Sequence, residues 1–409
     1  MIFSLILLLH SVTASMQMGA VMPDGKVDKV VSADNQATDK WHAPVWGVDV
    51  NVDFAPDWKA LQQWNNATIG VGLSYWNMGH EKLGHAIAPY IYMDIPLVKL
   101  THFELGLRPG LGAAFMTKTY RNTISPEQMF VSLGDANSCI GSVTNLYFPE
   151  ELYLSFPIAK GWKLSLSAGW YHISNGSIRQ PNSGYNIFGG ELGVSKVIEA
   201  QCTGGRCVEE HAADMNNASS EKTKKWSIAM AGTMGGRQVY HADQQTFMVG
   251  TMHASGYWHA HKIFRLGAGV DVFYDGAYVP RKTNFVKTNL ALAQKGDCWR
   301  VGLSVQPEFM VGNFTAGLHV GAYMHDPVKA LEPEWEVKKK EELPQERLDK
   351  PIFYAYDLLK AGAPGNPDGW LYTEVVLRYH LPWHVFVQAM MKSHLTKVEF
   401  VSVGLGFYY

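Results

Sequence analysis

The sequence predicts an all-β protein, a transmembrane antiparallel β-barrel of the outer-membrane type with about 14–16 strands. Long stretches alternate between apolar side chains on one face and Gly, aromatic or charged side chains on the other, as strands between lipid and a polar lumen do. Beyond the first residues no apolar run reaches about 18 residues, so membrane-spanning helices are not expected. A soluble β-sandwich also alternates, but its strands are usually about 5 to 6 residues long. The runs in this chain have about 9 to 14 residues, enough to cross a bilayer at a tilt.

Three segments carry the alternation most clearly. In VEFVSVGLGFYY, residues 398–409, Val, Leu and Phe alternate with Ser and Gly, and the chain ends on an aromatic residue. In RLGAGVDVFYD, residues 265–275, and WLYTEVVLRYH, residues 370–380, the second face also carries Arg, Asp or Glu. A period of two residues places each set on one side of a strand, so we expect the apolar sets to face lipid.

About fifteen such runs can be counted. Bacterial single-chain barrels use even numbers of strands, so we expect 14 or 16, depending on the first run and on an indistinct one near 26–32. The candidate strands are 45–54, 67–77, 86–96, 102–116, 143–157, 162–174, 185–198, 225–235, 246–258, 262–275, 298–311, 314–324, 370–380, 384–394 and 398–409.

The lengths of the connections predict which side of the membrane they lie on. Short links such as LVKLT, IAKG, HAHK, VGN and LPWH resemble periplasmic turns, and 117–142, 276–297 and 325–369 resemble outer loops. The charged run EWEVKKKEELPQER in the last of these is expected to be a solvated loop. We expect 199–224 to be a periplasmic connection between barrel halves 45–198 and 225–409, which either share one barrel or form two.

The start of the chain resembles an export signal. Residues 1–14 contain a short apolar run, and Val12 and Ala14 are small enough for cleavage after Ala14, although no Lys or Arg precedes the run. Residues 15–44 would then be an N-terminal segment, and the alternative for the apolar run is a buried helix. Four Cys agree with an oxidising compartment: Cys202 and Cys207 lie close enough for a small disulfide loop, and Cys139 could pair with Cys298. Zinc binding by these cysteines is the weaker reading, because no nearby His has the usual ligand spacing.

The net charge limits the partners. A formal charge of -2 gives no electrostatic reason to expect a nucleic acid or another polyanion. The sequence leaves homo-oligomerisation open.

One polar stretch, YHISNGSIRQPNSGYN, stands at the junction of two predicted strands. His172 and Ser174 continue the apolar parity of strand 162–174, and Asn186 lies on the apolar parity of the strand that follows. Residues i and i+2 share a face about 6.5 to 7 Å apart, so the His172 ring can reach the Ser174 hydroxyl on the lipid side. This pairs a nucleophile with a general base, and Asn175 and the backbone around Gly176 are candidate oxyanion donors. Polar edging at a barrel rim is the alternative for each residue taken singly.

The same residues resemble a known family, the outer-membrane lipid A 3-O-deacylases and acyloxyacyl-hydrolase-like barrels in their long version. The resemblance rests on H-x-S-N followed by P-N-x-G, on the upstream IGSVTN, and on the segments WKALQQWNNATIGVGLSYWN and MMKSHLTKVEFVSVGLGFYY. It covers about 45–198, with a fainter match in the C-terminal half. The motif residues are His172, Ser174, Asn175, Pro181, Asn182 and Gly184.

The resemblance implies roles for these residues. Ser174 would be the nucleophile, His172 its base and Asn175 an oxyanion donor. Where the family places a Glu that orients the His, this chain has Asn186, and the nearby Glu191 has lumenal parity. An Asn can hold an imidazole tautomer but cannot stabilise imidazolium by charge, so we expect a slower enzyme or altered specificity, and an inactive relative is the alternative.

The expected function is that of a serine esterase in the outer membrane, without metal or organic cofactor, acting on lipid A or a similar acylated glycolipid. Trp170 and Phe188 are expected to pack against the acyl chain or to belong to the aromatic girdle. The alternatives are a non-enzymatic barrel that passes a solute or binds a ligand, and a phospholipase of the same fold class. His394 and Glu399 could suggest a second site, but His394 has lumenal parity and is expected to brace the lumen with Glu374 and Arg378.

Overall fold

The computed structural model describes residues 9–21, 44–56, 58–125, 136–198, 225–239, 245–279, 296–327, 370–394 and 397–409. Within these residues the chain forms two units, and each is a closed antiparallel barrel of eight strands. The predicted fold class is confirmed, and the question of one barrel or two is answered: the sixteen strands are divided equally.

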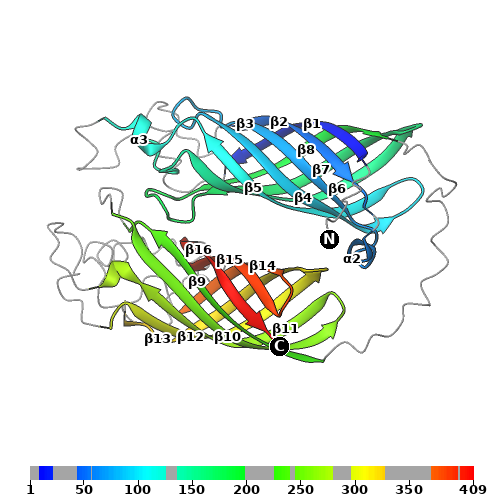
Figure 1. The fold of residues 1–409 in the computed structure, drawn as a ribbon. Helices are drawn as coiled ribbons and strands as arrows, with labels where there is room; N and C mark the ends of the chain where they lie inside the picture. Colours follow the sequence, from blue (N-terminus) through cyan, green and yellow to red (C-terminus); the bar gives the residue numbers. More distant parts are fainter. Residues whose placement is uncertain are drawn as a thin grey trace, which may run out of the picture. The chain divides into compact units, whose positions relative to one another are not determined.

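The first barrel follows the chain order from β1 to β8, and β1 pairs with β8 to close it (Figure 1). Two short helices, α2 (Lys59–Gln62) and α3 (Tyr120–Thr123), lie in its connections. Its strands are β1 (Leu9–Val21), β2 (Pro44–Phe54), β3 (Thr68–Asn77), β4 (His85–Lys99), β5 (Glu104–Met116), β6 (Thr144–Ala159), β7 (Trp162–Ser174) and β8 (Tyr185–Val197).

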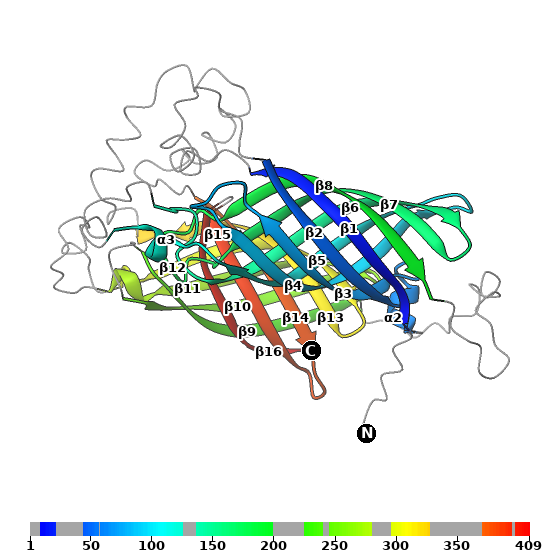
Figure 2. The ribbon, with the colours of Figure 1, turned by 90° about the horizontal axis from the view of Figure 1, so that it is seen from above.

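The second barrel runs from β9 to β16 and closes where β9 pairs with β16. Figure 2 shows the strands of each barrel running obliquely around its wall. A single turn of 3-10 helix, η1 (Gly276–Tyr278), follows β11. The strands are β9 (Trp226–Arg237), β10 (Phe247–His261), β11 (Phe264–Asp275), β12 (Trp299–Val311), β13 (Phe314–His325), β14 (Leu371–His380), β15 (Val385–His394) and β16 (Lys397–Tyr408).

All fifteen predicted runs are strands, and the sixteenth strand, β1, is the one that was missed. Its lumenal side chains are Ser and Thr hydroxyls and one Gln, and its outer face carries Met16 and Met18. Small and polar residues after an apolar run are also typical of an export signal, so this segment of the sequence predicts a cleavage site as readily as a strand. In the structure Ala14 lies inside β1, paired with Val50 and Val194. The predicted boundary between 1–14 and 15–44 thus falls within β1, and the export signal stays a prediction.

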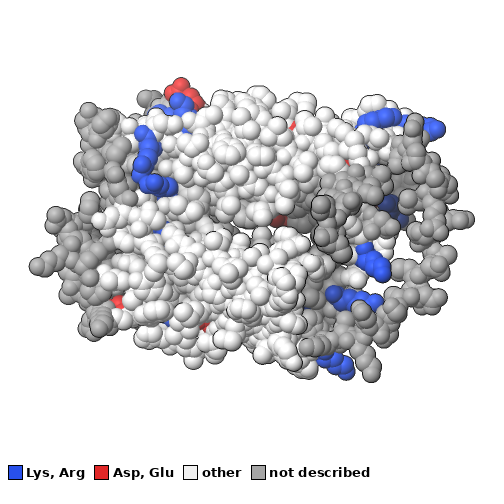
Figure 3. Space-filling view, in the orientation of Figure 1, with Lys and Arg blue, Asp and Glu red and all other residues white. Residues whose placement is uncertain are grey.

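The predicted faces are confirmed. Val403 and Phe407 are 67% and 66% exposed on the outside, whereas Glu374 and Arg378 are buried in the lumen. On the face drawn in Figure 3, the middle of each barrel wall is almost free of Lys, Arg, Asp and Glu, which lie nearer the ends. An uncharged belt around a polar interior is the arrangement that a bilayer requires.

The first barrel is filled by a polar network. Glu191 accepts a hydrogen bond from Ser15 at 2.9 Å and another from Gln17, and Arg108 bonds Asp94 across neighbouring strands. Glu191 therefore faces the lumen, as its parity predicted, and takes no part in the outer surface.

The short connections lie where the sequence predicts them, and the sides of the membrane assigned to the connections stay predictions. The five short links join consecutive strands. None of the described residues forms a helix long and apolar enough to cross a bilayer. The run near 26–32, the connection 199–224 with Cys202 and Cys207, and most of 325–369 lie outside the described residues. Cys139 and Cys298 are buried and do not form the disulfide considered from the sequence.

Candidate active site

The candidate site lies on the outside of the hairpin formed by β7 and β8. His172 and Asn186 are directly paired across the two strands, and Trp170 and Phe188 form the next outward-facing pair. Trp170 and Phe188 are exposed, which confirms that this parity faces outward. Ser174 is the last residue of β7 and is buried by the loop that follows it.

Hydrogen bonds link the three predicted residues in a row. The Nε2 atom of His172 lies 2.9 Å from the Ser174 Oγ atom, and its Nδ1 atom lies 2.8 Å from the Asn186 Oδ1 atom. An amide oxygen can only accept, so Nδ1 carries the proton and Nε2 presents its lone pair to the Ser174 hydroxyl. This is the tautomer that a general base needs. The structure therefore brings together His172, Ser174 and Asn186 as the sequence predicted.

A fourth residue, Trp170, controls the orientation of Asn186. The Trp170 indole Nε1–H donates to the same Asn186 Oδ1 atom at 3.1 Å. Because an indole nitrogen can only donate, the oxygen of the amide, and not its NH2 group, must face both Trp170 and His172. The sequence suggested only packing for Trp170; its position two residues before His172 on the same face was the available signal.

The His172 ring is held between aromatic neighbours. The ring centroids of Trp170 and Phe148 lie 5.3 Å and 6.2 Å from that of the imidazole. Gly184 closes another side: it has φ +73, and a Cβ atom there would lie 3.1 Å from the His172 Cε1 atom. A side chain at this position would therefore press on the ring, which explains the Gly of the motif.

Asn175 differs from its prediction as an oxyanion donor. Its backbone N–H donates to Asn182 Oδ1 at 3.0 Å, and its Nδ2 group donates to Ser142 Oγ at 2.8 Å and to the Arg179 carbonyl at 2.9 Å. All three N–H groups thus have acceptors, two in the same loop and one in Ser142, which precedes β6. Asn175 organises the loop in this state, and an oxyanion role would require these bonds to be exchanged. Gly176, the other predicted donor, has φ +62, a conformation that Gly adopts readily.

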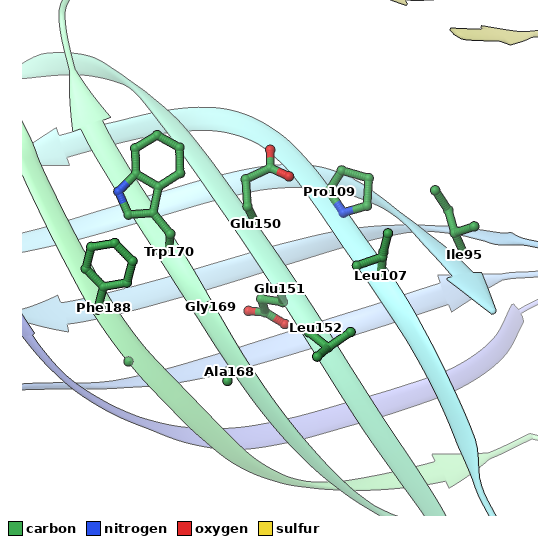
Figure 4. A pocket seen from close by; sticks show the side chains of 11 residues that line it. Ile95, Leu107, Pro109, Glu150, Glu151, Leu152, Ala168, Gly169, Trp170 and Phe188 are labelled. Carbon is green, nitrogen blue, oxygen red and sulfur yellow. The ribbon is translucent and has the colours of Figure 1, made fainter. Parts of the chain in front are cut away.

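A groove of about 590 Å³ runs along the outer wall beside the hairpin. Figure 4 shows the Trp170 and Glu150 side chains on the neighbouring strands β7 and β6, where the two residues are directly paired. The groove is otherwise mainly apolar, with Ile95, Leu107, Leu152 and Phe188 among its lining residues. Glu150 is exposed on this lipid-facing parity, and the sequence prediction passed over it, although a Glu among outward Leu and Phe residues was a visible signal.

The corresponding hairpin of the second barrel, β15 and β16, carries His394. Its side chain is buried in the lumen, as predicted, and its Nε2 atom lies 3.1 Å from Glu399 Oε2. Glu374 and Arg378 are also buried in the lumen; Arg378 bonds Glu308 and Gln388, and the groups near His394 include Glu399 and Tyr323.

Two family models match the chain. Residues 46–195 match lipid A 3-O-deacylase (PagL), and residues 224–336 match the C-terminal domain of acyloxyacyl hydrolase. Among solved structures, the chain is similar to the outer membrane enzyme PagL, with 20% identity over 46% of this chain and 99% of that chain and a TM-score of 0.28. Neisserial surface protein A is 11% identical over 46% of this chain and 96% of its own, with a TM-score of 0.28.

A third solved structure, CdiB from Acinetobacter baumannii, is 9% identical over 98% of this chain and 60% of its own, with a TM-score of 0.19. No curated protein matches the chain.

Proposed function

We propose that this chain is a serine esterase of the outer membrane that removes a fatty acyl chain from lipid A or a related acylated glycolipid. The matches of residues 46–195 to lipid A 3-O-deacylase (PagL) and of residues 224–336 to the C-terminal domain of acyloxyacyl hydrolase support this proposal. The observation that carries this proposal is the row of hydrogen bonds from Ser174 through His172 to Asn186. It lies on the outward parity of the barrel, where an acylated lipid can approach.

The reaction begins when His172 Nε2 takes the Ser174 proton and the Ser174 Oγ atom attacks the ester carbonyl. The carbonyl oxygen becomes an oxyanion, for which the backbone N–H groups around Gly176 are the proposed donors. The bond from the carbonyl carbon to the sugar oxygen breaks, and the imidazolium returns its proton to that oxygen. Water then attacks the acyl-enzyme, with His172 again as base, and releases the fatty acid.

Asn186 and Trp170 set the tautomer on which both steps depend. If the amide turned over, its NH2 group would face His172, the ring would carry its proton on Nε2, and the Ser174 proton would have no acceptor. The Trp170 indole opposes this turn because it would lose its only acceptor in the site. The Trp170 indole thus helps Asn186 to orient the His172 ring as a carboxylate at position 186 would, but the negative charge of a carboxylate is missing.

The groove is the proposed acyl-binding surface. Phe188 and Trp170 line it directly beside the His172–Asn186 pair, so a chain whose ester lies at Ser174 can continue along β7. A carboxyl group on a lipid-facing wall is costly unless it meets a polar group. We propose that Glu150 contacts a polar group of the substrate. Glu150→Leu would then change which acyl chains are released. An unchanged set of released acyl chains would exclude this role.

The test is mass spectrometry of lipid A after incubation of purified protein with lipopolysaccharide. We expect loss of an acyl chain with the wild type and none with Ser174→Ala. Ser167→Ala is the matched control, because Ser167 lies on the same strand with the opposite parity and its hydroxyl has no hydrogen-bond partner. Equal acyl loss from wild type and Ser174→Ala would overturn the mechanism. Release of fatty acid only from phospholipid vesicles would replace the substrate by a phospholipid.

A further inference from the structure

The lumen of the second barrel gathers two histidines and two carboxylates from four strands. They are His253 on β10, Asp271 on β11, His319 on β13 and Glu374 on β14, all with at most 3% of their surface exposed. His253 is directly paired with Asp271, and His319 is directly paired with Glu374. The two pairs meet inside the barrel: ligand atoms of His253, Asp271 and Glu374 lie within 4.8 Å of one another.

The distances are close to those of a metal coordination sphere. His253 Nδ1 lies 2.8 Å from Asp271 Oδ1 and 3.9 Å from Glu374 Oε2, and His319 Nδ1 lies 3.5 Å from the same Glu374 oxygen. Zinc bonds of about 2.0 to 2.2 Å in a tetrahedron place neighbouring ligand atoms about 3.3 Å apart. These three distances lie on either side of this value, and the ligand atoms of His253, Asp271 and Glu374 all lie within 4.8 Å of one another.

Glu374 lacks the partners that other lumenal carboxylates have. Both of its oxygens are buried without a hydrogen bond among the described residues. By contrast, Glu308 is bonded by Arg265 and Arg378, and Glu399 by Arg300 and Lys392. A buried carboxylate without a hydrogen bond is strongly unfavourable, so a cation between Glu374 and the two neighbouring histidines would account for its position.

The atom of the cluster that lies closest to a Glu374 oxygen is Nδ1 of His319. The His319 Nε2–H donates to Glu308 at 2.9 Å, because a carboxylate can only accept, and the neutral form of this ring then presents its Nδ1 lone pair to Glu374. Among the described residues, His319 Nδ1 has no hydrogen bond, and it lies 3.5 Å from Glu374 Oε2. A nitrogen lone pair and a carboxylate oxygen that face each other repel unless a cation lies between them.

Neighbouring side chains in the lumen already orient Asp271 and His319. Tyr372 donates to the second oxygen of Asp271 at 2.6 Å, and Glu308 holds the ring of His319. Carboxylate and hydroxyl partners of this kind are typical of metal ligands, because they set the tautomer and the direction of the ligand atom.

We propose that His253, Asp271 and Glu374 bind one divalent transition metal ion of the zinc class in the lumen of the second barrel, with His319, whose Nδ1 atom lies 3.5 Å from Glu374, as the fourth ligand. Two neutral imidazoles and two carboxylates around a divalent ion give a complex without net charge, which suits a buried site. The ion replaces the proton between His253 and Asp271, which is released on binding. By joining β10, β11, β13 and β14, it stabilises the barrel wall and is separate from the outward-facing Ser174 site.

The test uses the full chain without an affinity tag, refolded in detergent with a chelator and then exposed to Zn2+ or Co2+. After removal of the excess, we expect one zinc ion per chain and, with Co2+, the visible absorption of a tetrahedral site. Glu374→Gln and His253→Gln lose the bound ion. His259→Gln is the matched control: it removes a His from the same strand β10, where it bonds Ser227 rather than the cluster, and it should bind as the wild type does.

Metal binding should also raise the unfolding temperature of the wild type and leave that of Glu374→Gln unchanged. A wild-type chain that takes up neither ion overturns the proposal and indicates instead that a protonated His319 bridges Glu308 and Glu374. Uptake by Glu374→Gln equal to the wild type also overturns it. If a variant fails to fold, the stoichiometry and the cobalt spectrum of the wild type still decide.

Discussion

Strands β7 and β15 each carry a His at or near their last residue, His172 and His394, and the two residues have opposite surroundings. His172 is on the outward parity between a hydroxyl and an amide, whereas His394 is in the lumen beside Glu399. Glu399 also binds Arg300 and Lys392, so His394 belongs to a charged network that braces the barrel. The comparison shows that the side of the barrel wall on which a residue lies decides what the same side chain contacts: lipid on the outside, or other polar groups in the lumen.

The sharpest test of this comparison replaces each His by Gln. His172→Gln should lower the rate of acyl release by a factor of about 10³ or more, since the base is lost and only binding and oxyanion contacts persist. His394→Gln should leave the rate unchanged. The measurement is the initial rate of fatty acid release from lipopolysaccharide, and equal losses from both variants would end the distinction between the hairpins.

The converse test concerns stability. Glu399→Gln leaves Arg300 and Lys392 buried without their carboxylate, so we expect a loss of about 3–5 kcal/mol in the free energy of unfolding. Denaturant titration in detergent measures this free energy. Asn186→Ala, in the hairpin β7–β8, is the comparison variant. If Glu399→Gln lowered the free energy of unfolding less than Asn186→Ala does, the lumenal network at hairpin β15–β16 would not be what stabilises the barrel.

The role of Trp170 predicts a smaller effect on activity. Trp170→Phe keeps the aromatic packing but removes the N–H donor, so kcat should fall by about 10- to 100-fold, as for other orienting partners. In an Asn186→Asp background the loss should nearly vanish, because a carboxylate has no NH2 group to turn toward His172. Nitrogen NMR of the His172 ring reports the tautomer directly, and an unchanged tautomer in Trp170→Phe would rule out the orienting role.

The smallest effect is expected from Asn186→Asp in the wild-type background. A carboxylate would stabilise the imidazolium that forms during the reaction, and we expect kcat to rise by about 10-fold. The kinetic measurement is the same as for His172→Gln. A fall in kcat would mean that the amide itself is required.

Much of the site could be predicted because it depends on local alternation. The parity of 162–174 and 185–198 placed His172, Ser174 and Asn186 on one outer face, and Glu191 inside, before any pairing was known. The acceptors of the Asn175 N–H groups could not be foreseen, because Ser142 and Asn182 lie in different segments of the chain. The indole bond of Trp170 likewise depends on the register between β7 and β8.

The sequence by itself determined the class of fold, fifteen of the sixteen strands and the face that each side chain takes, because a strand has a period of two residues wherever it lies. The tertiary structure decided the rest. Only closure of the sheet identified β1, divided the strands into two barrels, and brought His253 and Asp271 together with His319 and Glu374. These features depend on pairing between residues far apart in the chain, and that pairing exists only once the barrel has closed.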